Sequence, residues 1–233
     1  MIGVLVNTFT VIIGSLIGLF FKKGIPKKIS DAIMLGIGLC TIYIGISGML
    51  EGKHTLIIII SMVLGAIVGT SLELDDKIGG LGNFISKHFQ KNSFVQGSIT
   101  EGFVTASLLF CIGAMTIVGS LNAGLTGDNE MLFTKSVLDF ISSIMLSVSL
   151  GIGVLISALF VFIFQGGIVL LSTFLQPILS EGVISEITCV GSILILALGL
   201  NIIGITKIKV VNYLPSLLFI PFLYWISNKI PFF

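Results

Sequence analysis

The most chemically suggestive residues of this chain lie in an apolar stretch in its second half. Lys135 and Asp139 are four residues apart, the spacing at which two side chains meet on one helical face and form an ion pair. Ser136, Ser143 and Ser147 continue the same face. Because charged groups in an apolar environment are costly unless paired or hydrated, we expect this polar stripe to face protein or water. It indicates either a water-lined pathway with a binding site or a packed surface whose serines bond to their own helix.

Further polar candidates lie in or beside other apolar stretches. Glu101 and Thr105 share a helical face, and Gln165 precedes two glycines at which we expect a helix break. Three asparagines lie near the ends of apolar stretches: Asn7, Asn122 and Asn201. Together with backbone carbonyls freed at a break, such side chains could coordinate a cation or bind a small polar solute. Hydrogen bonding between packed helices is the structural alternative.

The elements that must position these residues are membrane helices. Of the 233 residues, 55% are hydrophobic and 10% are charged, whereas soluble domains carry about 25% charged residues. Stretches long enough to approach the roughly 20 residues of a crossing are Ile2–Phe21, Asp31–Leu50, Thr55–Leu72, Ile99–Leu121, Met131–Leu150, Ile152–Leu175, Ile184–Gly204 and Val210–Ile226. We predict an all-α, polytopic transmembrane helical bundle of seven or eight crossings that forms a single integral membrane domain over residues 1–233.

The lysines predict how the chain is threaded. A cluster in the first loop, at Lys22, Lys23, Lys27 and Lys28, should be cytoplasmic. The predicted parts are residues 1–72 with the first helices, 73–93 as a cytoplasmic amphipathic linker and 94–233 with the remaining helices. Near Gly151 the chain forms either two helices joined by a tight turn or a re-entrant hairpin that feeds one helix. Lys207 and Lys209 favour eight crossings with both termini outside, because only eight place them in the cytoplasm.

Short internal similarities predict a repeated helix pair. Cys111–Asn122 resembles Cys189–Asn201, and Ile37–Gly45 is a weaker third copy. Transporters commonly contain such repeats, with the binding site at the repeat interface. Two GxxxG motifs, Gly14/Gly18 and Gly65/Gly69, allow helices to approach closely within the chain or in a homo-oligomer.

The sequence lacks the patterns of several other classes of protein. The 12 basic residues include no arginine and form no basic face, so we expect no nucleic-acid partner. There is no HExxH, GxSxG or Walker A motif, and His54 and His88 both fall in predicted loops. We therefore expect no enzymatic activity, no metal and no cofactor. A Ser–Lys dyad built on Lys135 is the enzymatic alternative.

Four segments carry a resemblance to a known family: Ser107–Leu121, Gly124–Asp128, Lys135–Asp139 and Gln165–Gly166. They are similar to the bacterial membrane proteins of Domain of Unknown Function family 554, and the similarity covers nearly the whole chain. That family is described as uncharacterised, with a suggested role in transport. The resemblance implies a multi-pass protein of the bacterial inner membrane.

These observations predict a secondary transporter or channel-like permease for a small ion or polar solute, with the lipid bilayer as its surroundings. In that interpretation Lys135 and Asp139 neutralise each other at rest, and Asp139 or Glu101 binds a coupling cation or a proton. The alternative is a non-transporting structural or regulatory subunit that acts through helix–helix interfaces.

Overall fold

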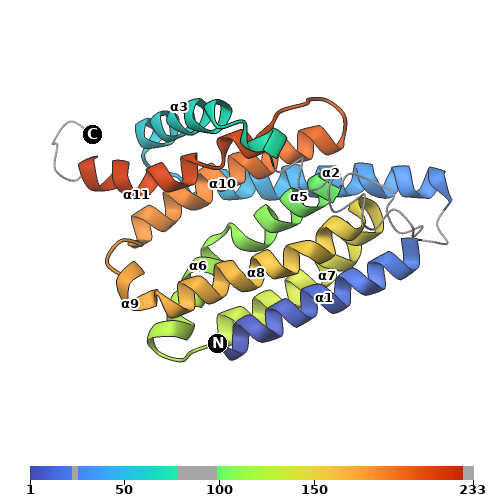
Figure 1. Ribbon diagram of the computed structural model, residues 1–233, viewed down its shortest axis with the longest axis horizontal. Helices are drawn as coiled ribbons and strands as arrows, with labels where there is room; N and C mark the ends of the chain where they lie inside the picture. Colours follow the sequence, from blue (N-terminus) through green and yellow to red (C-terminus); the bar gives the residue numbers. More distant parts are fainter. Residues whose placement is uncertain (23–25, 78–98, 228–233) are drawn as a thin grey trace.

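A computed structural model of the chain describes residues 1–22, 26–77 and 99–227. The helices are α1 (Ile2–Lys22), α2 (Lys27–Met49), α3 (Thr55–Ser71), α5 (Ile99–Cys111), α6 (Ala114–Leu125), α7 (Glu130–Leu150), α8 (Ile152–Leu170), α9 (Ser172–Leu175), α10 (Glu181–Ile202), the 3-10 turn η1 (Val210–Tyr213) and α11 (Ser216–Ser227) (Figure 1). These described parts contain no strand, and the predicted all-α bundle is confirmed. Of the predicted cytoplasmic linker, residues 73–77 are described, and residues 78–93 lie outside the described residues.

The number of crossings can be compared with helix length and apolarity. Six described helical segments are long and apolar enough to span a bilayer, and a seventh is added if α5 and α6 count as one bent span. With 17 residues, α3 lies at the short end of the lengths that span a membrane. Gly151, at φ 76°, separates α7 from α8, so this region is two helices joined by a tight turn. An eighth crossing through α3 stays a prediction.

The helix break lies elsewhere than the glycine pattern predicted. We expected a break at Gln165–Gly167, but α8 continues through these residues without interruption. A glycine inside a helix costs only about 1 kcal/mol, which packing readily offsets. We expected one continuous crossing from Ile99 to Leu121, but α5 and α6 are bent by 59°. Gly113 sits at the bend with φ 147°, a backbone conformation that favours glycine.

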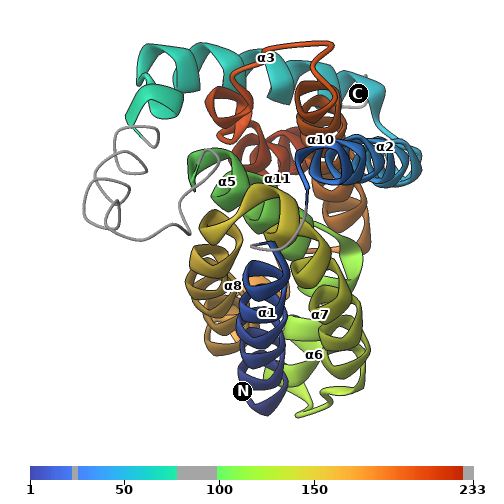
Figure 2. The same ribbon diagram turned by 90° about the vertical axis from the view of Figure 1, so that its right-hand side faces the viewer.

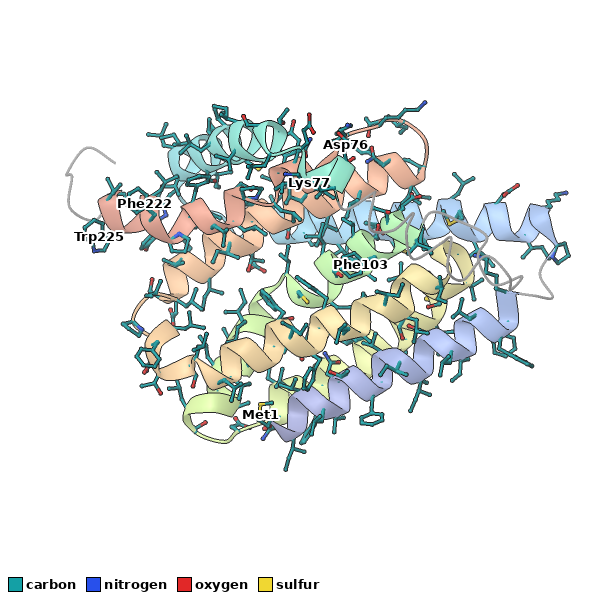
Figure 3. All side chains as sticks on the ribbon, in the orientation of Figure 1. Met1, Asp76, Lys77, Phe103, Phe222 and Trp225 are labelled. Carbon is teal, nitrogen blue, oxygen red and sulfur yellow. The ribbon has the colours of Figure 1, made fainter. Side chains whose placement is uncertain are left out.

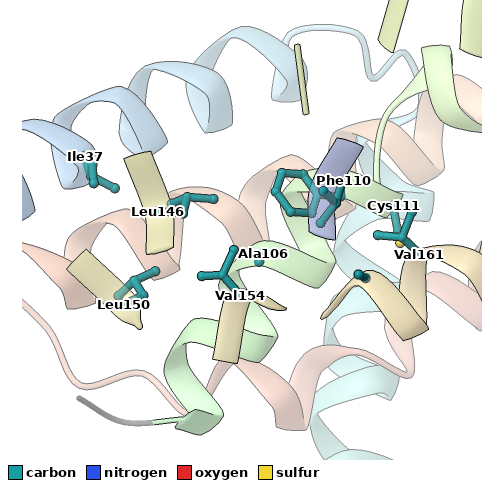
Figure 4. Close-up of a cluster of buried hydrophobic side chains, with 10 residues drawn as sticks. Ile37, Ala106, Phe110, Cys111, Leu146, Leu150, Val154 and Val161 are labelled. Atoms are coloured by element: carbon teal, nitrogen blue, oxygen red, sulfur yellow. The ribbon is translucent and has the colours of Figure 1, made fainter. Parts of the chain in front are cut away.

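The helices form two groups with α5 between them (Figure 2). One group contains α1, α6, α7 and α8, and the other contains α2, α3, α10 and α11. A buried cluster that includes Ile37 of α2, Val11 of α1 and Phe110 of α5 joins the groups (Figure 4). Large apolar side chains also cover the outside, including Phe222 and Trp225 of α11, which are more than half exposed (Figure 3). An outer surface of this kind suits contact with lipid.

Glycines set the closest helix contacts. Gly14 faces Ser143 and Phe140 of α7, and Gly18 faces the backbone of Ile144. Since residue numbers rise together on both helices, α1 and α7 run parallel. A Cβ atom on Gly18 would lie 2.3 Å from the Ile144 carbonyl oxygen, so only glycine permits this approach.

The second GxxxG motif is also occupied within the chain. Gly65 lies against Ser216, and Gly69 lies against the backbone of Asn212. The predicted homo-oligomer through the GxxxG faces is therefore corrected, because both faces are buried by helices of the same chain. An oligomer would need another surface.

Several contacts join segments that the lysine pattern places on one side of the membrane. Lys209 Nζ lies 2.9 Å from Asp76, and the Asp75 amide donates to Asn212. The hydrogen bond to Asp76 raises the pKa of the exposed Lys209. Near the predicted outer side, the Gly3 amide donates to Asn129 Oδ1 at 3.0 Å. These contacts agree with the predicted alternation of the helices.

Candidate functional site

An ion pair lies buried between α1 and α7. Lys135 Nζ donates to Asp139 Oδ1 at 2.9 Å, and the two side chains are only 8% and 5% exposed. The second carboxylate oxygen of Asp139 accepts a hydrogen bond from Asn7 Nδ2 at 3.0 Å. One turn of α7 thus carries both charges, and the fully buried Asn7 of α1 donates to the Asp139 oxygen that Lys135 does not contact.

Desolvation makes such a pair costly to keep. Moving two charges out of water costs several kcal/mol per ion, and their attraction repays this only with good geometry and further hydrogen bonds. Lys135 has three donors and uses one of them on Asp139. Buried charge pairs are therefore weak evidence for stability, and a binding role explains their presence better.

Gln165 adds an amide at the same level of the bundle. It is fully buried, and neither its amide oxygen nor its amide nitrogen has a hydrogen-bond partner among the described residues. Val161 and Val169, one turn to either side, share apolar clusters with Val11 and Val4 of α1, respectively. Because α1 and α8 run antiparallel, this register places Gln165 level with Asn7.

Unpartnered polar atoms of this kind are candidate contacts for a ligand or a buried water. The amide oxygen of Asn7 also has no partner within the described part of the chain. A buried polar group without a partner costs about 1–3 kcal/mol, so buried groups in native proteins are nearly always paired. Asn7 and Gln165 together carry three such atoms. They are three of the eleven buried side-chain atoms that lack a partner among the described residues.

Cys111 ends α5 at the broken helix. It is buried in the cluster that also contains Val11 of α1 and Val161 of α8 (Figure 4). Thr116 Oγ1 of α6 donates to the Phe110 carbonyl at 3.0 Å and satisfies a group freed by the bend. The break in the chain thus comes at the edge of the buried core that α1, α5 and α8 share.

An apolar cavity of about 360 Å³ adjoins the break. Helices α5, α6, α8, α10 and α11 form its wall, and Cys111 and Phe164, the residue before Gln165, both line it. Ser107 brings a buried hydroxyl to the wall, and this hydroxyl has no partner among the described residues.

The serine stripe is packed rather than open over most of its length. Ser136 donates to the Leu132 carbonyl and Ser143 to the Phe140 carbonyl, so both bond to their own helix. Ser143 and Ser147 are fully buried under Gly14 and Gly18 of α1. For these serines the stripe faces protein, and the candidate site is confined to the level of Asp139.

The other predicted site residues lie apart from the ion pair. Glu101 and Asn201 both line a separate cavity of about 170 Å³. The Asn201 side chain holds the loop after α10, because it donates to the Ile208 carbonyl and accepts from Thr206 and the Ile208 amide. Thr105 is fully buried in α5, and Asn122 is half-buried near the end of α6.

A buried carboxylate that the sequence pattern missed ties α10 to the loop before α3. Glu186 is fully buried, and its Oε1 accepts from the Lys53 and His54 amides at 2.8 and 2.9 Å. His54 Nδ1 lies 2.9 Å from the same oxygen, and the His54 ring packs edge-to-face on Tyr224. The partners of Glu186 lie more than 130 residues away along the chain, so no local spacing reveals them. Within the described parts, no three His, Cys, Asp or Glu side chains are grouped to hold a metal ion.

Comparison with known proteins gives a consistent assignment. A family model described as "Protein of unknown function (DUF554)" matches residues 2–225. The chain is 38% identical to the uncharacterized membrane protein YdfK of Bacillus subtilis over 225 residues, which cover 95% of this chain and 94% of YdfK. It is 29% identical to the uncharacterized protein YqgA of Escherichia coli over 220 residues, 93% of each chain. No solved structure matches.

Proposed function

The chain belongs to the DUF554 family, whose compared members include a membrane protein but carry no assigned activity, and on this premise we propose that it is a permease. It moves a small ion or polar solute across the bacterial inner membrane, as a secondary transporter or a channel-like protein. The observation that carries this proposal is the buried Lys135–Asp139 pair, with the unpartnered amide oxygen of Asn7 and the unpartnered amide of Gln165.

The arrangement suggests how a solute is exchanged. At rest, Lys135 and Asp139 satisfy each other, and this keeps the site neutral in the apolar bundle. An arriving solute or ion competes for these partners, while Asn7 and Gln165 supply the remaining hydrogen bonds. Each partner is buried, so the exchange takes place without bulk water.

The break between α5 and α6 supports alternating access. In transporters, discontinuous helices near the bilayer midplane form the substrate site, and alternating access comes from motion of one helical bundle against another around it. Here the 59° bend lies at Gly113, two residues beyond Cys111, which is buried in the cluster that includes Val11 of α1 and Val161 of α8. Rotation about Gly113 would move α6 relative to α5 and open the site on one side.

Flux through reconstituted protein tests the proposal. Purified full-length chain in liposomes is assayed with ²²Na⁺, ⁸⁶Rb⁺ and a mixture of ¹⁴C-labelled amino acids, against protein-free liposomes. Flux of at least one probe should depend on the wild-type chain and fall about tenfold or more in Asp139→Asn. Asp128→Asn, which changes an exposed acid of the loop before α7, is the matched control and should keep wild-type flux. No flux of any probe, or full flux in Asp139→Asn, would refute the proposal.

The packed serines favour a second candidate, a non-transporting structural or regulatory subunit. Ser143 and Ser147 lie under α1 as they would in a rigid scaffold. Such a protein would bind partners through its outer apolar faces. It would show no flux, and cross-linking in the native membrane would recover a stoichiometric partner that Asp139→Asn does not release.

A further inference from the structure

We propose that the apolar cavity beside the helix break binds one phospholipid of the surrounding membrane. One acyl chain fills the cavity, and the headgroup end of the lipid lies in a neighbouring hollow at the edge of the bundle, where α10 begins and α11 ends. This inference is independent of the proposed permease, because no residue of the ion pair takes part in it.

The lining of the cavity excludes water and charged ligands. Among the described residues, it contains one hydroxyl group, of Ser107, and no charged side chain. A buried water typically makes about three hydrogen bonds, and apolar cavities that cannot supply them stay dry. An empty space of about 360 Å³ would destabilise the bundle, because the cost of a void rises with its volume. The cavity therefore requires an apolar occupant.

The cavity is elongated along the helices. At one end, Leu108 of α5 and Leu214, just before α11, pack in one apolar cluster. At the other end, Ile168 of α8 and Leu179, just before α10, pack in a second cluster. All four residues line the cavity, which therefore extends along α11 from Leu214 to Pro221. An extended acyl chain matches this shape.

The cavity opens toward the lipid-facing surface of the bundle. Leu218 and Phe160, which both line it, are 80% and 40% exposed. Farther along α11, the large side chains of Phe222 and Trp225 are exposed as well (Figure 3). The cavity is thus continuous with the surface that contacts the bilayer. Because phospholipid is the most abundant apolar molecule around the bundle, mass action favours it over other apolar solutes.

A hollow of about 560 Å³ adjoins the cavity at the end of the bundle. Pro221 lines both spaces, and Tyr224 of the hollow packs in the same apolar cluster as Leu217 of the cavity. Ser180, Tyr224 and Trp225, which carry hydroxyl groups or an indole N–H, line the hollow. Tyr and Trp are enriched in membrane proteins at the level of the headgroups. The hollow therefore suits the glycerol and headgroup part of the lipid.

A lipid in this position contacts both groups of helices. The cavity wall includes α6 and α8 of one group, α10 and α11 of the other, and α5 between them. Cys111 and Ile117 line it from either side of the bend at Gly113. The acyl chain thus lies against both arms of the broken helix and fills the space that the side chains leave open.

Photocrosslinking in liposomes tests the site. The purified full-length chain is reconstituted with phosphatidylethanolamine that carries a diazirine at the end of one acyl chain, irradiated, digested and mapped by mass spectrometry. Adducts should form on Leu108 and Cys111, which are 5% and 2% exposed and therefore out of reach of bulk lipid. A diazirine next to the ester group should instead label the hollow near Ser180. Adducts of the chain-end probe only on exposed residues, such as Leu218 and Cys40, would overturn the proposal.

Variants that fill the cavity should displace the lipid. Leu217→Trp fills it from α11 and should lower the adducts on Cys111 about tenfold or more, while those on the exposed Cys40 stay unchanged. Leu138→Trp, on the exposed face of α7, is the matched control and should be labelled as wild type. If Leu217→Trp does not fold, Ile117→Phe fills the same cavity from α6. Undiminished labelling of Cys111 in a folded cavity variant would refute the acyl-chain site.

Native mass spectrometry of the purified chain separates a phospholipid from other apolar ligands. One phospholipid per chain should survive extensive detergent washing in the wild type and be lost in Leu217→Trp. A bound apolar molecule of another class, in place of the phospholipid, would contradict the assignment. Labelling of Cys111 without any flux would support the lipid site and refute the permease. Flux that depends on Asp139, without labelling of Cys111, would support the permease and refute the lipid site.

Discussion

Removing one charge of the buried pair should destabilise the protein more than removing both. In Lys135→Met, the Asp139 carboxylate stays 5% exposed with only Asn7 as partner. In Asp139→Leu, the buried ammonium of Lys135 has lost its acceptor. Breaking a buried pair from one side costs about 3–5 kcal/mol of unfolding free energy.

The double variant Lys135→Met/Asp139→Leu removes both charges at once. Its main cost is the amide nitrogen of Asn7, which loses its acceptor at a cost of about 1–3 kcal/mol. The two single losses together should therefore exceed the loss in the double variant by about 3 kcal/mol or more. The coupling should be favourable, because each buried charge lowers the free energy of unfolding only when its partner is absent.

Unfolding in mixed micelles with increasing dodecyl sulfate, followed by far-UV circular dichroism, measures the four proteins of the cycle. The exposed pair Lys209–Asp76 has the same 2.9 Å separation and serves as control. Its cycle of Lys209→Met and Asp76→Leu should give no resolvable coupling, since exposed pairs are screened by water. If the losses at Lys135 and Asp139 simply add, the pair is not desolvated as the structure indicates, and the reasoning is refuted.

Three further predictions concern packing. Gly18→Ala should cost about 1–3 kcal/mol of unfolding free energy, because its Cβ would meet the α7 backbone. Gly36→Ala, with open space around it, should be neutral or stabilising. Equal effects of the two variants in the micelle assay would contradict the close packing of α1 on α7. Glu186→Leu should speed amide exchange at His54 about tenfold, as seen by hydrogen–deuterium mass spectrometry, and unchanged exchange would show that the carboxylate does not hold the loop. Ser143→Cys, in a chain without its native cysteines, should resist a water-soluble maleimide, and rapid labelling would indicate a hydrated stripe.

The sequence predicts the fold class well because the signals are local. Apolar stretches of about 20 residues require helices in a membrane, and each long helix observed overlaps one of the eight predicted stretches. The spacing of Lys135 and Asp139 predicts their pairing, since it depends only on helical geometry. The sequence does not indicate that the helix breaks at Gly113 rather than at Gln165–Gly167. Gly113 is one of 28 glycines, and its backbone conformation is defined only in the folded chain.

The binding site itself depends on contacts between distant segments. Asn7 meets Asp139 across 132 positions, and nothing in either segment specifies the other. The same holds for Glu186 and the loop at Lys53 and His54. The sequence alone determined a membrane bundle with a charge pair on one helix, because composition and helical period act locally. Only the tertiary structure decided that α1 covers the serines and that Asn7 reaches Asp139, because many weak packing contacts together determine which helix faces meet.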